Sequence, residues 1–242
     1  MLTACHIPAS RPARQIREIM VASEERGTNM KVVAVNGSPR TNHNTAELLE
    51  GAIEGASSKG AEVERFDLYK LDFKGCRGCF ACKRKGGKSL HKCGIKDDLT
   101  PVLEAVADAD ALLVGSPIYF SDITGEARSF LERLLFQYLP YDTAVEDGTY
   151  FPRELKVGMV YSMGFPADPI DERLAPMERF LGLIFRTQPK SFKSQGCYPF
   201  MDSWEKYEAA PAMADLLANR EANFDAQVRE AFAFGASLVS EG

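Results

Sequence analysis

The sequence predicts an α/β protein: a doubly wound, five-stranded parallel sheet with helices on both faces. Two observations favour this class. From Lys31 onward, short apolar segments alternate with helical patterns, and this alternation is typical of parallel sheets covered by helices. The chain has 242 residues, of which 45% are hydrophobic, which is enough to bury one sizeable core.

Five segments have the patterns of strands. The first and third are short and apolar, as central parallel strands are, whereas the second alternates polar and apolar residues, as an outer strand does. Each is followed by a loop and, with the exception of the last, by a clear helical pattern after that loop. The predicted strands are 32–35, 62–68, 111–115, 156–161 and 191–198.

Side chains suited to helix starts support the expected helices. We expect Asn44 to cap a helix over 45–58, and Thr124 to cap a helix that ends near residue 138. Adjacent aspartates at 97 and 98 suit the start of another helix, because acids are stabilising there. A further helix is expected near 172–185.

The closing helix, expected over 221–239, is amphipathic. Its apolar residues near one face predict that it packs against the rest of the fold, and they are Phe224, Val228, Phe232 and Leu238. A ligand of such a sheet is expected beyond the carboxyl ends of the strands, near the point where the strand order reverses.

Charge and composition exclude several classes of protein. The formal net charge of −5 provides no basic field for nucleic acid, and the sequence lacks the long apolar run that a membrane-spanning helix needs. Residues 1–29 lack the apolar core of a secretory signal and are expected to form an N-terminal extension to a domain of residues 30–242. We therefore expect a soluble, cytoplasmic protein.

Three strand ends carry unusual loops, 36–45, 116–122 and 162–166, which would lie at the same edge of the sheet. The first offers side-chain donors together with the free amides of a helix start, a combination that suits a phosphate. An ordinary capped turn between strand and helix is the alternative interpretation. Dinucleotide and ATP fingerprints are absent, because no G-x-G-x-x-G follows the strand and no Walker A loop is formed.

Two motifs carry a family resemblance. The segment 36–40 reads Asn-Gly-Ser-Pro-Arg and is followed by Asn-Thr at 44–45, while 115–120 reads Gly-Ser-Pro-Ile-Tyr-Phe and is followed by Thr-Gly at 124–125. In this order, they resemble the flavodoxin-like NAD(P)H-dependent FMN reductases and the related iron-sulfur flavoproteins. The resemblance implies a flavodoxin-like FMN-binding domain over residues 30–242.

The resemblance also implies which residues bind the cofactor. The FMN phosphate would be held by Ser38, Arg40, Asn44 and Thr45. The isoalloxazine ring would be lined by the second and third loops, at Pro117, Ile118, Tyr119, Phe120, Ser162 and Gly164. An apolar, aromatic loop gives a flat ring a surface to stack on, although core packing is the alternative for the two aromatic residues.

The function implied is that of an FMN-dependent oxidoreductase that transfers electrons from NADH or NADPH to a small-molecule or protein acceptor. Since no second nucleotide domain is visible, the nicotinamide and the acceptor would use the exposed flavin face in turn. Relatives of this kind form homodimers or homotetramers. We assign no catalytic side chain, because the three histidines are scattered and make no nucleophile arrangement.

Four cysteines crowd together as Cys76, Cys79, Cys82 and, after ten more residues, Cys93. The compact run resembles the motif of iron-sulfur flavoproteins, but the last gap is longer than in that family. Three interpretations of these cysteines are left open, namely a [4Fe-4S] cluster, a zinc site and free thiols. The sequence favours free thiols. The alternative functions are accordingly an iron-sulfur electron carrier and a non-enzymatic flavin and thiol redox sensor.

Overall fold

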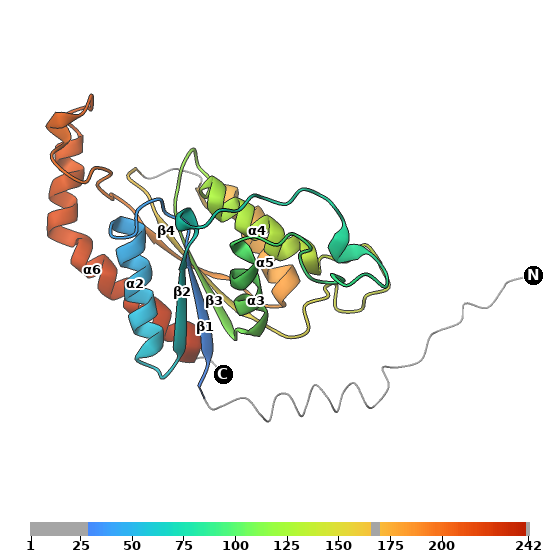
Figure 1. Cartoon of the computed structure of the whole chain (residues 1–242). Coiled ribbons are helices and arrows are strands. Elements are labelled where there is room, and N and C mark those ends of the chain that lie inside the picture. Colours follow the sequence, from blue (N-terminus) through green and yellow to red (C-terminus); the bar gives the residue numbers. More distant parts are fainter. Residues whose placement is uncertain (1–28, 166–169, 241–242) are drawn as a thin grey trace, which may run out of the picture.

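The computed structural model describes residues 29–165 and 170–240 and contains one five-stranded sheet with the strand order β2-β1-β3-β4-β5 (Figure 1). Every neighbouring pair of strands is parallel. The elements are β1 (Lys31–Asn36), α2 (Asn44–Ser57), β2 (Glu62–Asp67), α3 (Leu99–Asp108), β3 (Ala111–Pro117), α4 (Gly125–Tyr138), β4 (Lys156–Ser162), α5 (Ile170–Phe185), β5 (Lys190–Ser194) and α6 (Met213–Ser240), with short 3-10 turns at Leu68–Lys70, Ala81–Lys83 and Trp204–Lys206.

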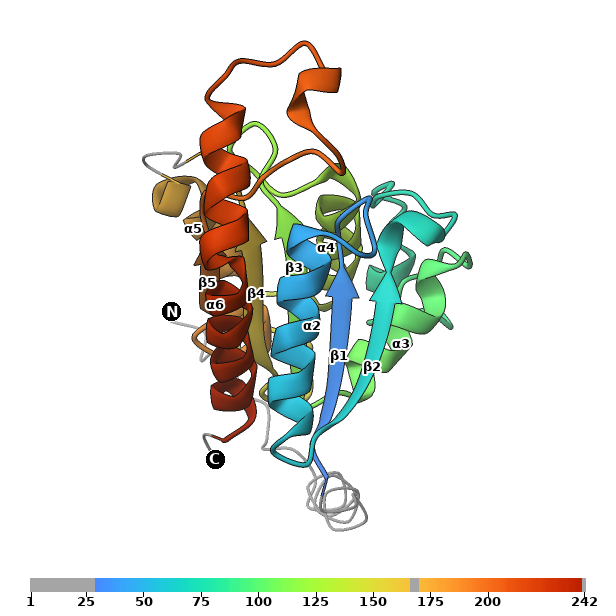
Figure 2. The same ribbon diagram turned by 90° about the vertical axis from the view of Figure 1, so that its left-hand side faces the viewer.

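Helices cover both faces of the sheet, which confirms the predicted doubly wound α/β fold. Figure 2 shows α2 and α6 side by side on one face, with α3, α4 and α5 on the other. Each face has its own buried apolar cluster. Side chains of β1 alternate between the two clusters. Val33 and Val35 belong to the cluster under α3, α4 and α5, and Val32 and Ala34 belong to the cluster under α2 and α6.

The predicted outer strand is at the edge of the sheet, as expected. β2 pairs only with β1 among the described strands, and its side chains are half-buried or exposed. The strand order turns back at β1, because the chain leaves β1 for the edge strand β2 and then crosses to β3. The switch point therefore lies between β1 and β3, at their carboxyl ends.

Some predicted boundaries were wrong. The last strand ends at Ser194 rather than 198, and α6 begins at Met213, eight residues earlier than predicted. Asn44 does not cap α2: His43 is the N-cap residue, and no side chain supplies the cap bond. The prediction for Thr124 is confirmed, because its side chain accepts a hydrogen bond from the Ala127 amide at the start of α4.

The predicted extension of residues 1–29 lies outside the described residues, except for Asn29. Within the described ranges, no helix combines the length and apolarity needed to cross a bilayer.

Candidate functional site

A cavity of about 230 Å³ lies at the switch point, beyond the carboxyl ends of β1, β3 and β4. The three loops singled out in the sequence meet here, together with a fourth segment that follows β5. The lining residues are Ser38, Arg40, His43, Asn44, Thr45, Pro117, Ile118, Tyr119, Ser162, Met163, Gly164, Cys197 and Pro199. Nine of the ten residues predicted to bind a cofactor are therefore brought together.

The first loop is held in shape by its own polar side chains. Buried Asn36 accepts a hydrogen bond from the Ser38 amide through Oδ1 (3.0 Å) and donates through Nδ2 to Asp67 (2.9 Å) and to the Arg40 carbonyl (3.3 Å). The Ser38 hydroxyl accepts from the Arg40 amide (3.1 Å). The loop that carries Ser38 and Arg40 is thus held in shape by hydrogen bonds among its own side chains and backbone.

Close packing ties the first loop to the second. The Gly37 amide donates to the Gly115 carbonyl (2.7 Å), and a Cβ at Gly37 would lie 2.8 Å from the Ala127 Cβ. Thr124 Oγ1 donates to the Gly37 carbonyl (2.7 Å), so the residue that caps α4 also anchors the first loop. Only glycine fits at position 37, because a side chain there would push the two loops apart.

The amino end of α2 points its donors at the cavity. No side chain caps this helix start, and its Ala46 and Glu47 amides donate to the His43 carbonyl (2.7 and 3.1 Å), which leaves the amides of Asn44 and Thr45 for a ligand. The Thr45 hydroxyl lies 2.6 Å from the Ser162 hydroxyl, which joins the first loop to the third. Hydroxyls, amides and the positive end of the helix dipole therefore face the same space, an arrangement that suits an anion.

Backbone carbonyls after β5 form the fourth wall, which the sequence reasoning missed. Arg40 Nη1 donates to the Pro199 carbonyl (2.5 Å), and Asn44 Nδ2 donates to the Tyr198 carbonyl (2.7 Å). His43 Nε2 also lies 3.1 Å from the Tyr198 carbonyl. A guanidinium carries five N–H donors and an amide two, so these bonds leave further donors on Arg40 and Asn44 for a ligand.

Arg220 from α6 is a second residue that the sequence reasoning did not single out. Its guanidinium donates to Asn44 Oδ1 and to Glu47 (2.8 Å) and lies 4.0 Å from the centre of the Phe224 ring. Because Arg220 occupies the amide oxygen of Asn44, it holds the amide nitrogen of Asn44 toward the Tyr198 carbonyl and the cavity. It is 176 residues distant from Asn44 in the chain, and only the packing of α6 on α2 brings the two together.

His43 is buried beside two arginines, and this environment affects its charge. Burial lowers the pKa of His43, and the nearby charges of Arg220 and Arg40 lower it further. The neutral imidazole is therefore favoured in the folded protein. His43 lies in the cavity wall, between the predicted phosphate-binding residues Arg40 and Asn44 in the sequence.

The lowered pKa predicts that stability falls as the solution becomes acidic. The unfolded chain takes up a proton at His43 near the ordinary value of 6.5, while the folded protein resists it until lower pH. The drop in melting temperature between about pH 7.5 and about pH 5.5 should therefore be smaller in His43→Gln than in the wild type. An equal drop in both proteins would contradict the prediction. The drop in melting temperature should also be smaller in His91→Gln than in the wild type, because burial lowers the pKa of His91 as well.

The second loop presents its residues unequally. Pro117, Ile118 and Tyr119 line the cavity, and the Ile118 amide donates to the Ser162 carbonyl (2.9 Å), which holds the loop against β4. Tyr119 is 45% exposed. Phe120, with a left-handed backbone (φ 52°) and a fully exposed side chain, is the one predicted site residue that does not line the cavity.

All four clustered cysteines line a separate, small cavity, which lies between α4 and the segment 76–93, called the cysteine loop below. Cys82 is buried, Cys76 and Cys93 are half-buried, and Cys79 is exposed. The cavity holds only about 20 Å³, and in the described ranges no three His, Cys, Asp or Glu side chains stand close enough to hold a metal ion. The four cysteines therefore share one cavity without forming a metal-binding cluster among the described residues.

Two buried side chains of α4 that line the same cavity each have an N–H donor without a hydrogen-bond partner among the described residues. Arg133 is 1% exposed and Gln137 is 3% exposed. Among the described residues, Arg133 Nε and Gln137 Nε2 have no hydrogen-bond partner, although both are buried. Buried donors almost always have partners, so these two are exceptions, and both lie in the wall of the cavity that the four cysteines line.

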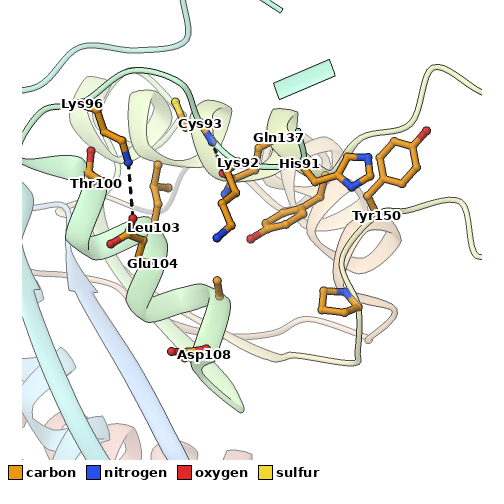
Figure 3. A pocket seen from close by; sticks show the side chains of 13 residues that line it. His91, Lys92, Cys93, Lys96, Thr100, Leu103, Glu104, Asp108, Gln137 and Tyr150 are labelled. Atoms are coloured by element: carbon orange, nitrogen blue, oxygen red, sulfur yellow. Dashed lines mark hydrogen bonds and ion pairs between the residues drawn. The ribbon is translucent and has the colours of Figure 1, made fainter. Parts of the chain in front are cut away.

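A larger cavity of about 500 Å³ lies between α3 and the loops around His91 and Tyr150, away from the switch point (Figure 3). The His91 and Tyr150 rings stack there, with centroids 3.8 Å apart. Its charged side chains have mixed sign, and those of the Lys96–Glu104 pair are 71% and 66% exposed. This cavity is larger than the one at the switch point, but the convergent polar groups favour the smaller one.

Comparisons with known proteins agree with the geometry. A family model described as NADPH-dependent FMN reductase matches residues 30–166. An iron-sulfur flavoprotein of Methanocaldococcus jannaschii is 34% identical over 104 residues, which cover 43% of this chain and 51% of the relative. An iron-sulfur flavoprotein of Archaeoglobus fulgidus is 40% identical over 104 residues, which cover 43% and 48%. The chain thus spans about half the length of the curated relatives it matches.

Solved structures confirm the fold. An NAD(P)H:quinone oxidoreductase from Methanothermobacter marburgensis is similar with a TM-score of 0.60 and 17% identity, covering 89% of this chain and 98% of that one. An azoreductase from Bacillus anthracis has a TM-score of 0.57 and 16% identity, covering 86% and 99%.

Proposed function

The chain belongs to the NADPH-dependent FMN reductase family, and from this premise we propose that it is an oxidoreductase that binds FMN at the switch-point cavity. It would transfer electrons from NADH or NADPH to a small-molecule or protein acceptor. The observation that carries the proposal is the meeting of a donor-rich helix start with an apolar, aromatic loop around one cavity at the switch point.

The residues divide into two groups by their chemistry. Ser38, Arg40, Asn44 and Thr45, with the amino end of α2, would hold the phosphate by hydrogen bonds and by charge. The backbone and side chains of Pro117, Ile118, Tyr119, Ser162 and Gly164 would line the ring. Phe120 is fully exposed, so it would reach only the open side of the ring.

When bound, FMN would supply the hydride and electron chemistry, and the chain's own residues would supply position and field. Tyr119, half-exposed at the rim, would leave one side of the cavity open to the nicotinamide and then to the acceptor. Cytoplasmic location and a homodimer or homotetramer are part of the same proposal, on the family resemblance alone.

Replacing Arg40 with alanine is expected to weaken FMN binding by about tenfold to a hundredfold, because it removes a charge-assisted hydrogen bond worth about 1.5–3 kcal/mol. Titration of the FMN-free protein with FMN, followed by the quenching of flavin fluorescence, measures this. Arg229→Ala on the exposed face of α6 is the control and should bind FMN as the wild type does. Equal affinities for Arg40→Ala and the control would place the phosphate elsewhere.

Replacing Tyr119 with alanine should affect the flavin more than the fold. The side chain is 45% exposed, so the melting temperature should hardly change, while the loss of a stacking contact should weaken FMN binding by about twofold to tenfold. Tyr141→Ala, at a tyrosine that is 66% exposed and outside the cavity, is the control. A large fall in stability with unchanged FMN binding would instead assign Tyr119 to packing.

The cysteine cavity favours a second candidate function, that of an iron-sulfur electron carrier. We propose, from the likeness to relatives named iron-sulfur flavoproteins, that Cys76, Cys79, Cys82 and Cys93 are the residues that would bind a [4Fe-4S] cluster. In the described residues, no three of these side chains stand close enough together to hold a metal ion, so the arrangement seen here does not fit a cluster. The support is that all four cysteines line one small cavity together with two unpartnered N–H donors, since thiolates bind such clusters. When bound, the cluster would supply one-electron transfer.

One measurement separates the two candidates. The protein is purified without oxygen, its FMN, iron and acid-labile sulfide are measured per chain, and it is then titrated with NADPH. Flavin without iron, bleached by NADPH, would support the reductase and leave the cysteines as thiols or a zinc site. Iron and sulfide near four per chain would support the carrier. A protein that binds no flavin even when FMN is added would overturn the main proposal.

A further inference from the structure

We infer that the segment 74–96, with the aromatic side chains beside it, is the docking surface for an acidic protein whose contact region also carries aromatic or other apolar side chains. The inference goes beyond the proposed function, because this surface lies at the carboxyl end of α4, whereas the switch-point cavity lies near the amino end of that helix. It requires neither FMN nor a metal.

Charge is segregated in this part of the chain. Between residues 74 and 96 the sequence has eight Lys or Arg residues and no Asp or Glu. The net charge of the whole chain is −5, so with +8 in this segment the rest of the chain carries −13. Because acidic residues outnumber basic ones in the chain as a whole, eight charges of one sign in a single segment form a local positive field.

These cations face solvent, and most of them lack an ion-pair partner. Every one of the eight except Lys83 is exposed. Among the described residues, Lys96 is the only one of the eight that forms an ion pair, with Glu104 at 3.7 Å. Residues 83–89 also line a hollow of about 880 Å³ at this surface. The segment therefore offers positive charge that the described acids leave largely unmatched.

An aromatic cluster lies beside the cations. Phe80 and Tyr141 are 48% and 66% exposed, and the centres of their rings are 5.7 Å apart. Phe136 of α4 packs edge-on against both, with ring centres 5.5 and 6.2 Å away. Lys83 joins the two features, since its ammonium lies 5.1 Å from the centre of the Phe136 ring. Protein interfaces combine such aromatic side chains with a polar, charged rim.

A strained backbone holds Phe80 in its exposed position. Its φ is 56°, in the left-handed region that is unfavourable for an aromatic residue. The Lys83 amide donates to the Phe80 carbonyl (2.9 Å) and closes the 3-10 turn Ala81–Lys83 that follows. Strained residues persist where the surrounding structure enforces them, and they gather at binding sites and switches. The strain at Phe80 is therefore a second reason to assign binding to this surface.

The arrangement of these groups favours a protein over other anions. A small phosphate ligand needs donors that converge in an enclosed cavity, whereas these cations are spread along an exposed segment. Nucleic acid and an anionic membrane extend beyond the surface and would meet the net negative charge of the rest of the chain. A compact acidic protein contacts the basic surface alone, and its apolar side chains would cover Phe80 and Tyr141.

The test measures how labelled acidic polymers bind the full chain at low salt, followed by fluorescence anisotropy. A copolymer of glutamate and tyrosine is the probe for an acidic protein surface, and polyglutamate is the probe for charge alone. The copolymer should bind more tightly than polyglutamate. Combining Lys85→Glu with Lys88→Glu should weaken copolymer binding by about tenfold, because both charges are exposed and unpaired among the described residues.

A second variant tests the aromatic cluster. Phe80→Asn removes the ring and suits the left-handed backbone, so the turn should keep its shape. It should weaken copolymer binding by about fivefold or more and leave polyglutamate binding unchanged.

Matched controls lie on other elements. Lys59→Glu combined with Arg229→Glu reverses two exposed charges, just after α2 and on α6, across the sheet from α4. Phe180→Asn replaces a phenylalanine of α5 that is 53% exposed. Both controls should bind the two polymers as the wild type does, since neither changes the segment 74–96.

Weaker copolymer binding in the two test variants, and not in the controls, supports the inference. Equal binding of the two polymers, unchanged by Phe80→Asn, overturns it and leaves an unspecific patch of positive charge. Tighter binding of duplex DNA or of phosphatidylserine vesicles than of the copolymer also overturns it. A lower molecular mass of the doubly reversed variant on gel filtration would instead assign the surface to a second copy of the chain. FMN binding is measured separately by flavin absorbance, so failure here leaves the proposed oxidoreductase standing.

Discussion

Replacing Gly235 with valine is expected to destabilise the fold by about 3 kcal/mol or more, because even a Cβ at this position has no room. The backbones of α2 and α6 touch here: a Cβ on Gly235 would overlap the Ala52 carbonyl oxygen and lie 2.7 Å from its Cα. Gly55 meets the Phe232 carbonyl in the same way from the other helix. Backbone atoms cannot turn aside as a flexible side chain can, so the helices must separate.

The consequences of this change reach the functional site. α6 carries Arg220 to Asn44, so a shift of α6 away from α2 would release the Asn44 amide and weaken FMN binding as well as stability. Urea unfolding followed by circular dichroism measures the loss. Ala233→Val, at an exposed position of α6 two residues earlier, introduces the same side chain where there is space and should cost about 0.5 kcal/mol. Equal losses in the two variants would show that helix propensity, and not contact, is responsible.

The close backbone contact between α2 and α6 also explains where the sequence prediction of α6 was wrong. Phe232 was placed with Phe224 and Leu238 on the buried face, but Phe232 is 38% exposed, while the other two are 4% exposed. At Phe232 the helix presents its backbone to Gly55, and a close backbone approach is not visible in a hydrophobic pattern. Sequence periodicity identifies an apolar face only where side chains fill the interface.

Local patterns did predict the fold and most of the cavity wall. Parallel strands put their carboxyl ends at one edge, so the loops after β1, β3 and β4 had to converge there. Thr124 was identified because a cap depends on neighbouring residues alone. Asn44 was misassigned as a cap because its tertiary partners, the Tyr198 carbonyl and Arg220, take up its side chain.

The fourth wall has a different physical origin. Tyr198 and Pro199 contribute carbonyl oxygens, which every residue has, so no residue type could mark them. The two unpartnered donors of α4 were invisible for a related reason: Arg133 and Gln137 have the spacing of an ordinary helical face, and only burial makes their N–H groups significant.

Replacing Arg133 with methionine is expected to destabilise the protein by about 3–5 kcal/mol, because it leaves a largely buried carboxylate without its partner. The side chain of Asp97 is 18% exposed and that of Arg133 is fully buried, so water cannot replace the lost contact at low cost. The carbonyls of Lys74 and Ile95 lose their donor at the same time.

Adding Asp97→Asn to Arg133→Met separates these causes. Asparagine keeps an oxygen for the Leu99 amide at the start of α3 but removes the unpaired charge. If the charge dominates, the double variant should recover most of the lost free energy of unfolding, measured in urea, since replacing both members of a buried ion pair is often tolerated. If single and double variants are equally unstable, the two carbonyl contacts dominate instead. Arg133 would then stabilise the fold chiefly by fastening the cysteine loop to α4.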